Sequence, residues 1–266
     1  MTATAHAVMA RGTAEHSWSA DPYADALRAG HGPLFLRRSD GWLLPLDVER
    51  WCARADAVDV QVLDRCEGAV LDVGCGPGRL VAELAARGRT ALGIDVSEAA
   101  VARTVGHGGQ ALLTSVFEPL PDEGRWRTTL LLDGNLGIGG DPDALLERLA
   151  RLLVPGGLLV AETVPTDVDE RVSVTFVRWT RDVGLTNAPA GTSVPFPWAR
   201  LGTRALLRYA GPLGWRTVDQ WSAGGRCFVA LRSRSTSRSA EPPKSPAVIN
   251  NQRARKPSPE SPVADG

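Results

Sequence analysis

The sequence predicts an α/β fold whose doubly wound, mostly parallel sheet carries helices on both faces. Two observations predict it. Short apolar runs of strand length alternate with segments of helical spacing, and a glycine-rich turn joins the first such strand to its helix. Length and composition agree, because 266 residues, 43% hydrophobic and 23% charged, suit one globular domain with tails.

Four regions are predicted along the chain. Residues 1–20 lack apolar periodicity and are expected to be disordered. Residues 21–66 are expected to form an N-terminal cap, and residues 67–232 the main domain. Residues 233–266 are expected to be a disordered tail, because their Ser, Arg and Pro cannot bury enough apolar surface. The expected elements of the cap are a helix that begins at Asp21-Pro22, a hairpin around Ser39–Gly41, and helices over 47–55 and 56–66.

The main domain alternates strands and helices over most of its length. Its expected strands are 69–73, 90–95, 110–113, 128–132 and 157–163, and its expected helices are 78–87, 98–105 and 142–153. This alternation favours a parallel sheet with right-handed crossovers. Residues 171–181 favour a strand that either extends this sheet or forms a flap. After a break at 195–198, the expected elements are a helix over 199–209 and a hairpin of strands 214–221 and 226–231.

The glycine-rich turn follows the first core strand, in the text VLDVGCGPGRL that begins at Val70. Gly74, Gly76 and Gly78 leave no side chains in the way. Backbone N–H groups at a helix N-terminus can then form a cradle for a carboxylate, hydroxyl or phosphate. Asp72 is within reach of these N–H groups or of a ligand ammonium, and Cys75 is interpreted as a small packing residue. We therefore expect a nucleotide-type cofactor here.

A second acid ends the next core strand. Asp95 lies 17 residues after Gly78, about the separation expected of a carboxylate that accepts both ribose hydroxyls. Ser97 follows as an N-cap for the next helix. A dinucleotide fingerprint would require a third glycine where the chain has Arg79, so this pattern counts against a dinucleotide without excluding it.

Three motifs occur in a continuous order: VLDVGCGPGRL, then GIDVS at 93–97, then LLVPGGLLVAE at 152–162. On these motifs the chain resembles the class I S-adenosylmethionine-dependent methyltransferases over residues 66–165, and more loosely to 232. The resemblance implies a Rossmann-like methyltransferase fold, S-adenosyl-L-methionine as cofactor and methylation of an acceptor. The segment 133–141 and the hairpin before the core resemble an actinobacterial-type group of unassigned substrate. The residues expected to bind the cofactor are Asp72, Gly74, Cys75, Gly76, Gly78, Asp95, Val96, Ser115, Val116 and Asp133.

The sequence departs from the family pattern in two places: at Ser115, and at Trp126-Arg127-Thr128, which stands where the fourth core strand usually begins with Phe-Asp. Ser115 stands where many relatives carry an acid for the adenine amine, so a weaker hydroxyl or backbone contact is expected. Val116 and Phe117 can still enclose the adenine ring, although Phe117 fits a core position equally well. Asp133 and Asn135 are expected to face the cofactor's amino-acid end or the substrate, unless this loop is only a flexible connection. The loop lacks the Asp/Asn-Pro-Pro-Tyr motif of enzymes that methylate amino groups of nucleic acid or protein.

The sequence thus predicts a methyltransferase that acts on a small-molecule acceptor, at an oxygen, nitrogen or carbon atom that it does not specify. The net charge of zero lacks the basic footprint of a nucleic-acid-binding protein. No apolar run approaches the ~18 residues of a membrane span. Four cysteines without metal-ligand spacing indicate reduced thiols, no metal site and a cytoplasmic location.

Several alternatives stay open from the sequence. An NAD(P)-dependent oxidoreductase, a non-catalytic S-adenosylmethionine-binding protein and an RNA methyltransferase that uses the Arg-Ser pairs of the tail are all compatible with parts of the pattern. An oxygen or nitrogen acceptor can require a general base. His31, Glu162 and Asp133 are comparable candidates for it, and none is chosen. The oligomeric state is not predicted.

Overall fold

The computed structural model of the protein describes residues 22–180, 184–187 and 194–234. The N-terminus predicted to be disordered, Asp21 and residues 235–266 of the predicted tail lie outside these described residues. Contacts divide the chain into two units, 1–236 and 237–266, and every described residue belongs to the first. None of the described helices has the length and apolar character that crossing a membrane requires.

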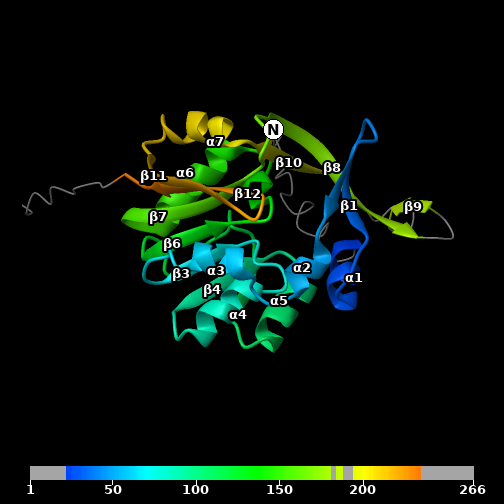
Figure 1. The fold of residues 1–266 in the computed structure, drawn as a ribbon, viewed down its shortest axis with the longest axis horizontal. Helices are drawn as coiled ribbons and strands as arrows, with labels where there is room; N and C mark the ends of the chain where they lie inside the picture. The colour runs from blue at the N-terminus through cyan, green and yellow to red at the C-terminus, as the bar shows by residue number, and fades with distance from the viewer. Residues whose placement is uncertain (1–21, 181–183, 188–193, 235–266) are drawn as a thin grey trace, which may run out of the picture. The chain divides into compact units, whose positions relative to one another are not determined.

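A seven-stranded sheet forms the centre of the described residues, in the order β11-β12-β7-β6-β3-β4-β5 (Figure 1). The strands β7, β6, β3, β4 and β5 run parallel, while β12 and β11 add an antiparallel hairpin beside β7. This arrangement confirms the doubly wound, mostly parallel sheet. The strand bounds are β3 Val70–Val73, β4 Ala91–Asp95, β5 Ala111–Leu113, β6 Trp126–Leu131, β7 Leu153–Thr163, β11 Arg216–Ala223 and β12 Arg226–Arg232.

Helices cover both faces of this sheet (Figure 1). One face carries α3 (Ala57–Leu63), α4 (Arg79–Ala86) and α5 (Glu98–Gly106), and the other carries α6 (Pro142–Leu152) and α7 (Thr203–Ala210). Each face has its own apolar core. Asp56 and Asp141 are the N-caps of α3 and α6, and their side chains accept hydrogen bonds from backbone N–H groups of the first turn.

A second sheet packs five further strands together. Its order is β10-β8-β1-β2, and β9 pairs with β8. The sequence left 171–181 open between an extension of the main sheet and a flap. The structure places it in this second sheet, where β8 lies between β1 and β10. The bounds are β1 Leu34–Arg38, β2 Leu43–Leu46, β8 Asp169–Thr180, β9 Gly184–Asn187 and β10 Phe196–Leu201.

The prediction of a break at 195–198 followed at once by a helix was wrong. Phe196–Leu201 is the strand β10, and α7 begins only at Thr203. The break was predicted from Pro195 and Pro197. Because β10 is an edge strand, the missing N–H of Pro197 can point away from the ladder, and Phe196, Ala199 and Leu201 are buried.

The cap over the main sheet is therefore composite. Two helices, α1 (Pro22–Ala29) and α2 (Val48–Cys52), pack with the second sheet around Leu27, Leu36 and Phe176. One part of the cap is formed by residues 22–52. The other part, β8 and β10, follows more than a hundred residues later in the sequence. This arrangement sets a wall of the second sheet opposite the carboxyl ends of the main sheet.

Candidate active site

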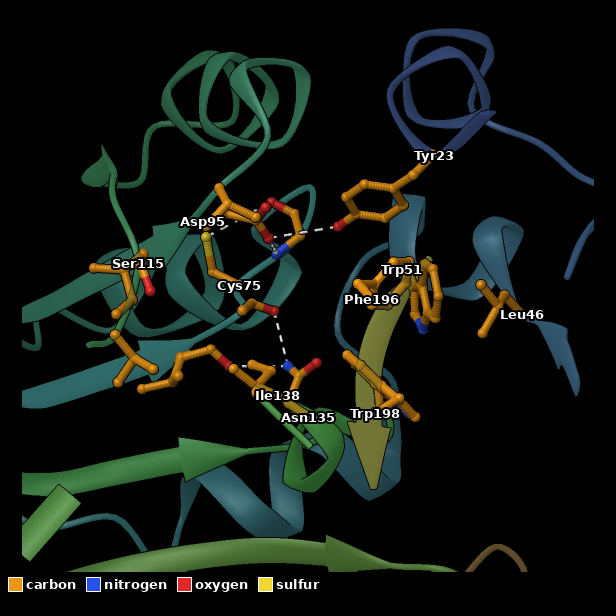
Figure 2. Close-up of a pocket in the computed structure, with 18 of the residues that line it drawn as sticks. Tyr23, Leu46, Trp51, Cys75, Asp95, Ser115, Asn135, Ile138, Phe196 and Trp198 are labelled. Carbon is orange, nitrogen blue, oxygen red and sulfur yellow. Dashed lines mark hydrogen bonds between the residues drawn. The ribbon is translucent and has the colours of Figure 1, made fainter. Parts of the chain in front are cut away.

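A cavity of about 280 Å³ lies between the carboxyl ends of β3, β4 and β6 and the second sheet. Ligands of open α/β sheets bind in this kind of crevice. Eight of the ten sequence-predicted cofactor-binding residues line it: Gly74, Cys75, Gly76, Asp95, Val96, Ser115, Val116 and Asp133. Asp72 and Gly78 are not among the lining residues. Figure 2 shows the cavity with Asp95, Cys75 and Ser115 on one side and Trp51, Phe196 and Leu46 on the other.

The glycine loop uses its N–H groups internally. Gly74 and Cys75 donate theirs to the Ile94 carbonyl (2.9 and 3.0 Å), and Gly76 donates to Asp95 Oδ2 (2.9 Å). Gly78 donates to the Cys75 carbonyl at 3.1 Å. The expectation that these groups form a bare cradle was therefore wrong. The end of β4 supplies acceptors that satisfy them first, as buried backbone donors require.

Gly78 serves the packing of two helices instead of the cavity. Its φ of +84° places it in the left-handed region, and it precedes α4. A Cβ atom there would clash with the Thr104 side chain of α5. The Thr104 hydroxyl donates to the Gly76 carbonyl at 3.0 Å. The close approach of α5 to the loop thus requires glycine at this position.

Asp95 lies in the cavity wall and is only 6% exposed. Its Oδ2 accepts from Gly76 N (2.9 Å) and the Tyr23 hydroxyl (3.4 Å), and its Oδ1 accepts from Ser97 N at 2.9 Å. Burial raises its pKa to about 6, although these donors lower it in part. Ser97 precedes α5 as predicted, but its side chain makes no capping hydrogen bond.

Asp72 lies below the loop. It is 2% exposed, and its Oδ2 has no hydrogen-bond partner among the described residues. Burial raises its pKa to about 7; Arg79 opposes this, and the nearby carboxylates of Asp133, Asp95 and Asp59 add to it. The region under the cavity is therefore crowded with acids.

Arg79, which stands in place of a third glycine, holds the centre of a buried ion network. Its guanidinium donates to Asp59 Oδ2 at 2.8 Å and pairs with Asp133 Oδ2 at 2.7 Å. Arg226 contacts Asp59 Oδ1 at 2.8 Å and Glu162 Oε2 at 2.7 Å. Burial raises the pKa of Asp59, but the hydrogen bonds and charges of Arg79 and Arg226 outweigh it and lower that pKa to about 2. No local motif signals this network, since its members come from distant elements.

Asp133 and Asn135 occupy the loop after β6, and both line the cavity. Asp133 Oδ2 is paired with Arg79, while Oδ1 pairs with Arg50 of α2 and with Arg226. Despite burial, these three arginines lower the pKa of Asp133. Asn135 Nδ2 donates to the carbonyls of Val73 and Gly74, both at 2.9 Å, so this side chain supports the glycine loop.

The three candidate bases have different surroundings. His31 is exposed and does not line the cavity. Glu162 does not line it either, and its carboxylate accepts from Arg226 and from Asp133 N. Asp133 lines the cavity but is held by arginines. Among the described lining residues there is no histidine, so no general base is assigned.

The segment after β5 also reaches the cavity. Ser115 Oγ accepts from Phe117 N at 3.3 Å, and Val116 is buried. Phe117 is 42% exposed and lines the cavity, so a core position does not describe it. Its ring lies beside Gly139, where a Cβ atom would approach it to 2.8 Å.

Sequence reasoning missed the opposite wall. Five aromatic side chains line the cavity there: Tyr23, Trp51, Phe176, Phe196 and Trp198. They come from α1, α2, β8 and β10. The only sequence signal was the abundance of aromatic residues in these segments. Which of them face inward depends on how the strands pair.

Together, a parallel sheet and a glycine loop that meets a strand-end carboxylate in one cavity define an α/β protein that binds a nucleotide-type cofactor. Residues 70–157 match the family model described as a methyltransferase domain. The chain is 29% identical over 166 residues to the ubiquinone biosynthesis O-methyltransferase of Caulobacter sp. (strain K31), and the match covers 56% of this chain. It spans only 65% of that relative's length.

Two solved structures share the fold. A methyltransferase from Bacteroides fragilis, in complex with S-adenosyl-L-homocysteine, aligns with a TM-score of 0.63 at 20% identity, over 83% of this chain and 96% of that one. The CcbJ methyltransferase from Streptomyces caelestis aligns with a TM-score of 0.56 at 17% identity, over 83% and 99%. Residues 70–157 thus match a methyltransferase domain, and the chain shares the fold of solved S-adenosylmethionine-dependent methyltransferases. The actinobacterial-type subgroup stays a prediction.

Proposed function

We propose that the protein binds S-adenosylmethionine and transfers its methyl group to a small-molecule acceptor. The observation that carries the proposal is the single cavity, which joins the glycine loop and Asp95 to a wall of apolar side chains. A nucleoside-type cofactor and a second molecule can meet there. The curated relative is named as an O-methyltransferase, which supports the same activity.

The residues present fit this cofactor. Asp95 offers a carboxylate that still has acceptor capacity for a ribose hydroxyl, since a carboxylate has about four acceptor positions and three donors use it here. Ser115 and Val116 are suited to the adenine side, and Asp133 and Asn135 to the amino-acid end. The crowded acids Asp72 and Asp95, whose pKa values are raised chiefly by burial, suit a ligand with a positive sulfonium.

When bound, the cofactor supplies a methyl group on a positively charged sulfur. The contribution of this chain is to bind, to align and to exclude water. Well-oriented reactants can gain roughly 7–11 kcal/mol from alignment alone. No general base is assigned among the described lining residues, and we propose that the acceptor releases its proton to water. The free thiols of the four cysteines fit the proposed cytoplasmic location.

The alternatives are less well supported. In a dinucleotide-binding loop the third glycine allows the helix to pack closely on the strand. Here Arg79 occupies that position, and its guanidinium is buried between Asp59 and Asp133. A non-catalytic binding protein would have the same cofactor site, so only turnover distinguishes it from an enzyme.

Calorimetric titration of the full chain tests the proposal. We expect S-adenosylhomocysteine to bind with micromolar affinity and NAD and NADP to give no signal. Release of S-adenosylhomocysteine from S-adenosylmethionine in an acceptor screen then measures methyl transfer. Binding of the dinucleotides instead would refute the proposed cofactor, and binding without turnover across the screen would favour a non-catalytic protein.

The affinity for S-adenosylmethionine is expected to decrease as the pH falls through 6. Burial raises the pKa of Asp95 to about 6, so the carboxylate accepts hydrogen bonds above that pH and becomes protonated below it. If only the carboxylate holds the ribose, affinity at pH 5 should be about 10-fold lower than at pH 7.5. Calorimetry at several pH values measures this. Asp72, with a pKa of about 7, titrates nearby, so Asp95→Asn is the control that should remove the decrease near pH 6.

A further inference from the structure

We infer that the acceptor is a flat aromatic molecule whose reacting group is an acidic hydroxyl and which carries no other charged group. This inference rests on the proposed function and specifies the substrate class of the same site. It follows from the half of the cavity opposite Asp95, where the described side chains are almost entirely apolar (Figure 2). Those side chains are Leu36, Leu46, Trp51, Phe176, Phe196 and Trp198.

The rings of Phe176, Phe196 and Trp198 form a continuous row, which Tyr23 extends toward Asp95. Tyr23 and Phe176 stack with centroids 5.3 Å apart and planes 11° from parallel. Phe176 and Phe196 lie 5.1 Å apart, and Phe196 meets Trp198 edge-on at 6.1 Å. Aromatic rings prefer offset or edge-on contact with other rings. A planar ring can therefore add to this row, whereas a sugar would bury its hydroxyls against carbon.

The charges of the cavity argue against an amine. Of the two acids that line the described cavity, Asp133 is paired with three arginines, and Asp95 lies across the cavity from the apolar half (Figure 2), where we propose that it binds the ribose. No charged side chain occurs among the described residues of the apolar half. A protonated amine would lie there without a counter-charge and beside a positive sulfonium, which is unfavourable.

An ionised hydroxyl is negatively charged, whereas a protonated amine is positively charged. Its negative oxygen would face the positive sulfonium, so the pair of reactants is neutral and requires no protein counter-charge. The hydroxyl loses its proton to water before transfer. An oxygen lone pair then forms the O–CH3 bond as the S–CH3 bond breaks, and sulfur keeps the bonding pair as a thioether. Asp133 is paired with arginines and Asp95 lies on the opposite side of the cavity (Figure 2), so a low-pKa phenol, which ionises without a nearby base, is the favoured acceptor.

Two probes test the inference on the full chain saturated with S-adenosylhomocysteine. 4-Nitrophenol represents the flat, acidic aromatic acceptor, and glucosamine represents the amine-bearing sugar. We expect calorimetry to show at least about 10-fold tighter binding of 4-nitrophenol, because only the ring gains aromatic contacts and avoids an unpaired charge. Equal or tighter binding of glucosamine would overturn the inference.

Phe196→Leu is the matched variant, because it removes the central ring of the row but keeps an apolar side chain. Its affinity for 4-nitrophenol should fall roughly 2- to 10-fold. Trp42→Leu, in an exposed residue outside the cavity, is the control and should change nothing. Trp51→Leu provides a second cavity variant with the same expected loss.

Binding of S-adenosylhomocysteine shows in each case whether the core is intact, and it should stay within about twofold of the unchanged protein. If both cavity variants bind 4-nitrophenol as the unchanged protein does, the aromatic site is refuted while the proposed function stands. If the unchanged protein does not bind S-adenosylhomocysteine, the proposed function itself fails.

Discussion

Asp59→Ala is expected to lower the free energy of unfolding by about 3–5 kcal/mol, because it removes the carboxylate that Arg79 and Arg226 share and leaves the network with an excess of positive charge. Asp59 is fully buried and contacts Arg79 and Arg226 at 2.8 Å each. The Arg79 side chain is itself only 4% exposed, so water cannot replace the lost carboxylate. Urea-induced unfolding followed by circular dichroism measures the change.

Asp64→Ala is the matched control for this prediction. Asp64 ends the same helix, but its side chain is 61% exposed and pairs with Arg87 at the surface. Exposed ion pairs contribute little, so its loss should stay within about 1 kcal/mol. Equal unfolding free energies for the Asp59 and Asp64 variants would contradict a stabilising role for the buried network.

Asp95→Ala should reduce the affinity for S-adenosylmethionine roughly 10- to 100-fold, or about 1.4–2.8 kcal/mol. The carboxylate lies in the cavity wall and is the group that we propose accepts from the ribose, and it also accepts from Gly76 N of the glycine loop. Its removal therefore takes away ligand contacts and loosens the loop that borders them. Calorimetric titration measures the affinity.

Asp64→Ala again serves as the control and should bind as the unchanged protein does. The Asp95 variant must first show a native circular dichroism spectrum, because Ser97 N also loses its acceptor. A folded Asp95→Ala protein with unchanged affinity would refute the assignment of Asp95 to the ribose. It would leave the cavity itself in place and direct attention to Ser115 and Asp133.

Local sequence patterns predicted the cofactor half of the site. The strand β3, the glycine turn and α4 are consecutive, and the left-handed φ angles of Gly74, Gly76 and Gly78 (+72°, +55° and +84°) agree with the choice of glycine. Asp95 follows from the end of the next parallel strand. Such features depend on neighbours in the chain, so a single sequence contains the information.

The sequence did not predict the hydrogen-bond partners of the loop N–H groups or of Arg79. The loop N–H groups were expected to face a ligand, yet they pair with Ile94 and Asp95. Arg79 was noted only as a missing glycine, and its partners Asp59 and Asp133 come from other elements. Long-range hydrogen bonds of this kind depend on packed positions that no local spacing encodes.

By itself the sequence determined the parallel core, the glycine loop and the strand-end acid, because periodicity and turn chemistry act over a few residues. Only the tertiary structure decided the apolar half of the cavity. Its wall joins β1 and β2 to β8 and β10, which are separated by more than a hundred residues. Strand pairing determines which face Phe176, Phe196 and Trp198 occupy, since a register slip of one residue would turn these three side chains to the other face. Tyr23 and Trp51 depend instead on how α1 and α2 pack.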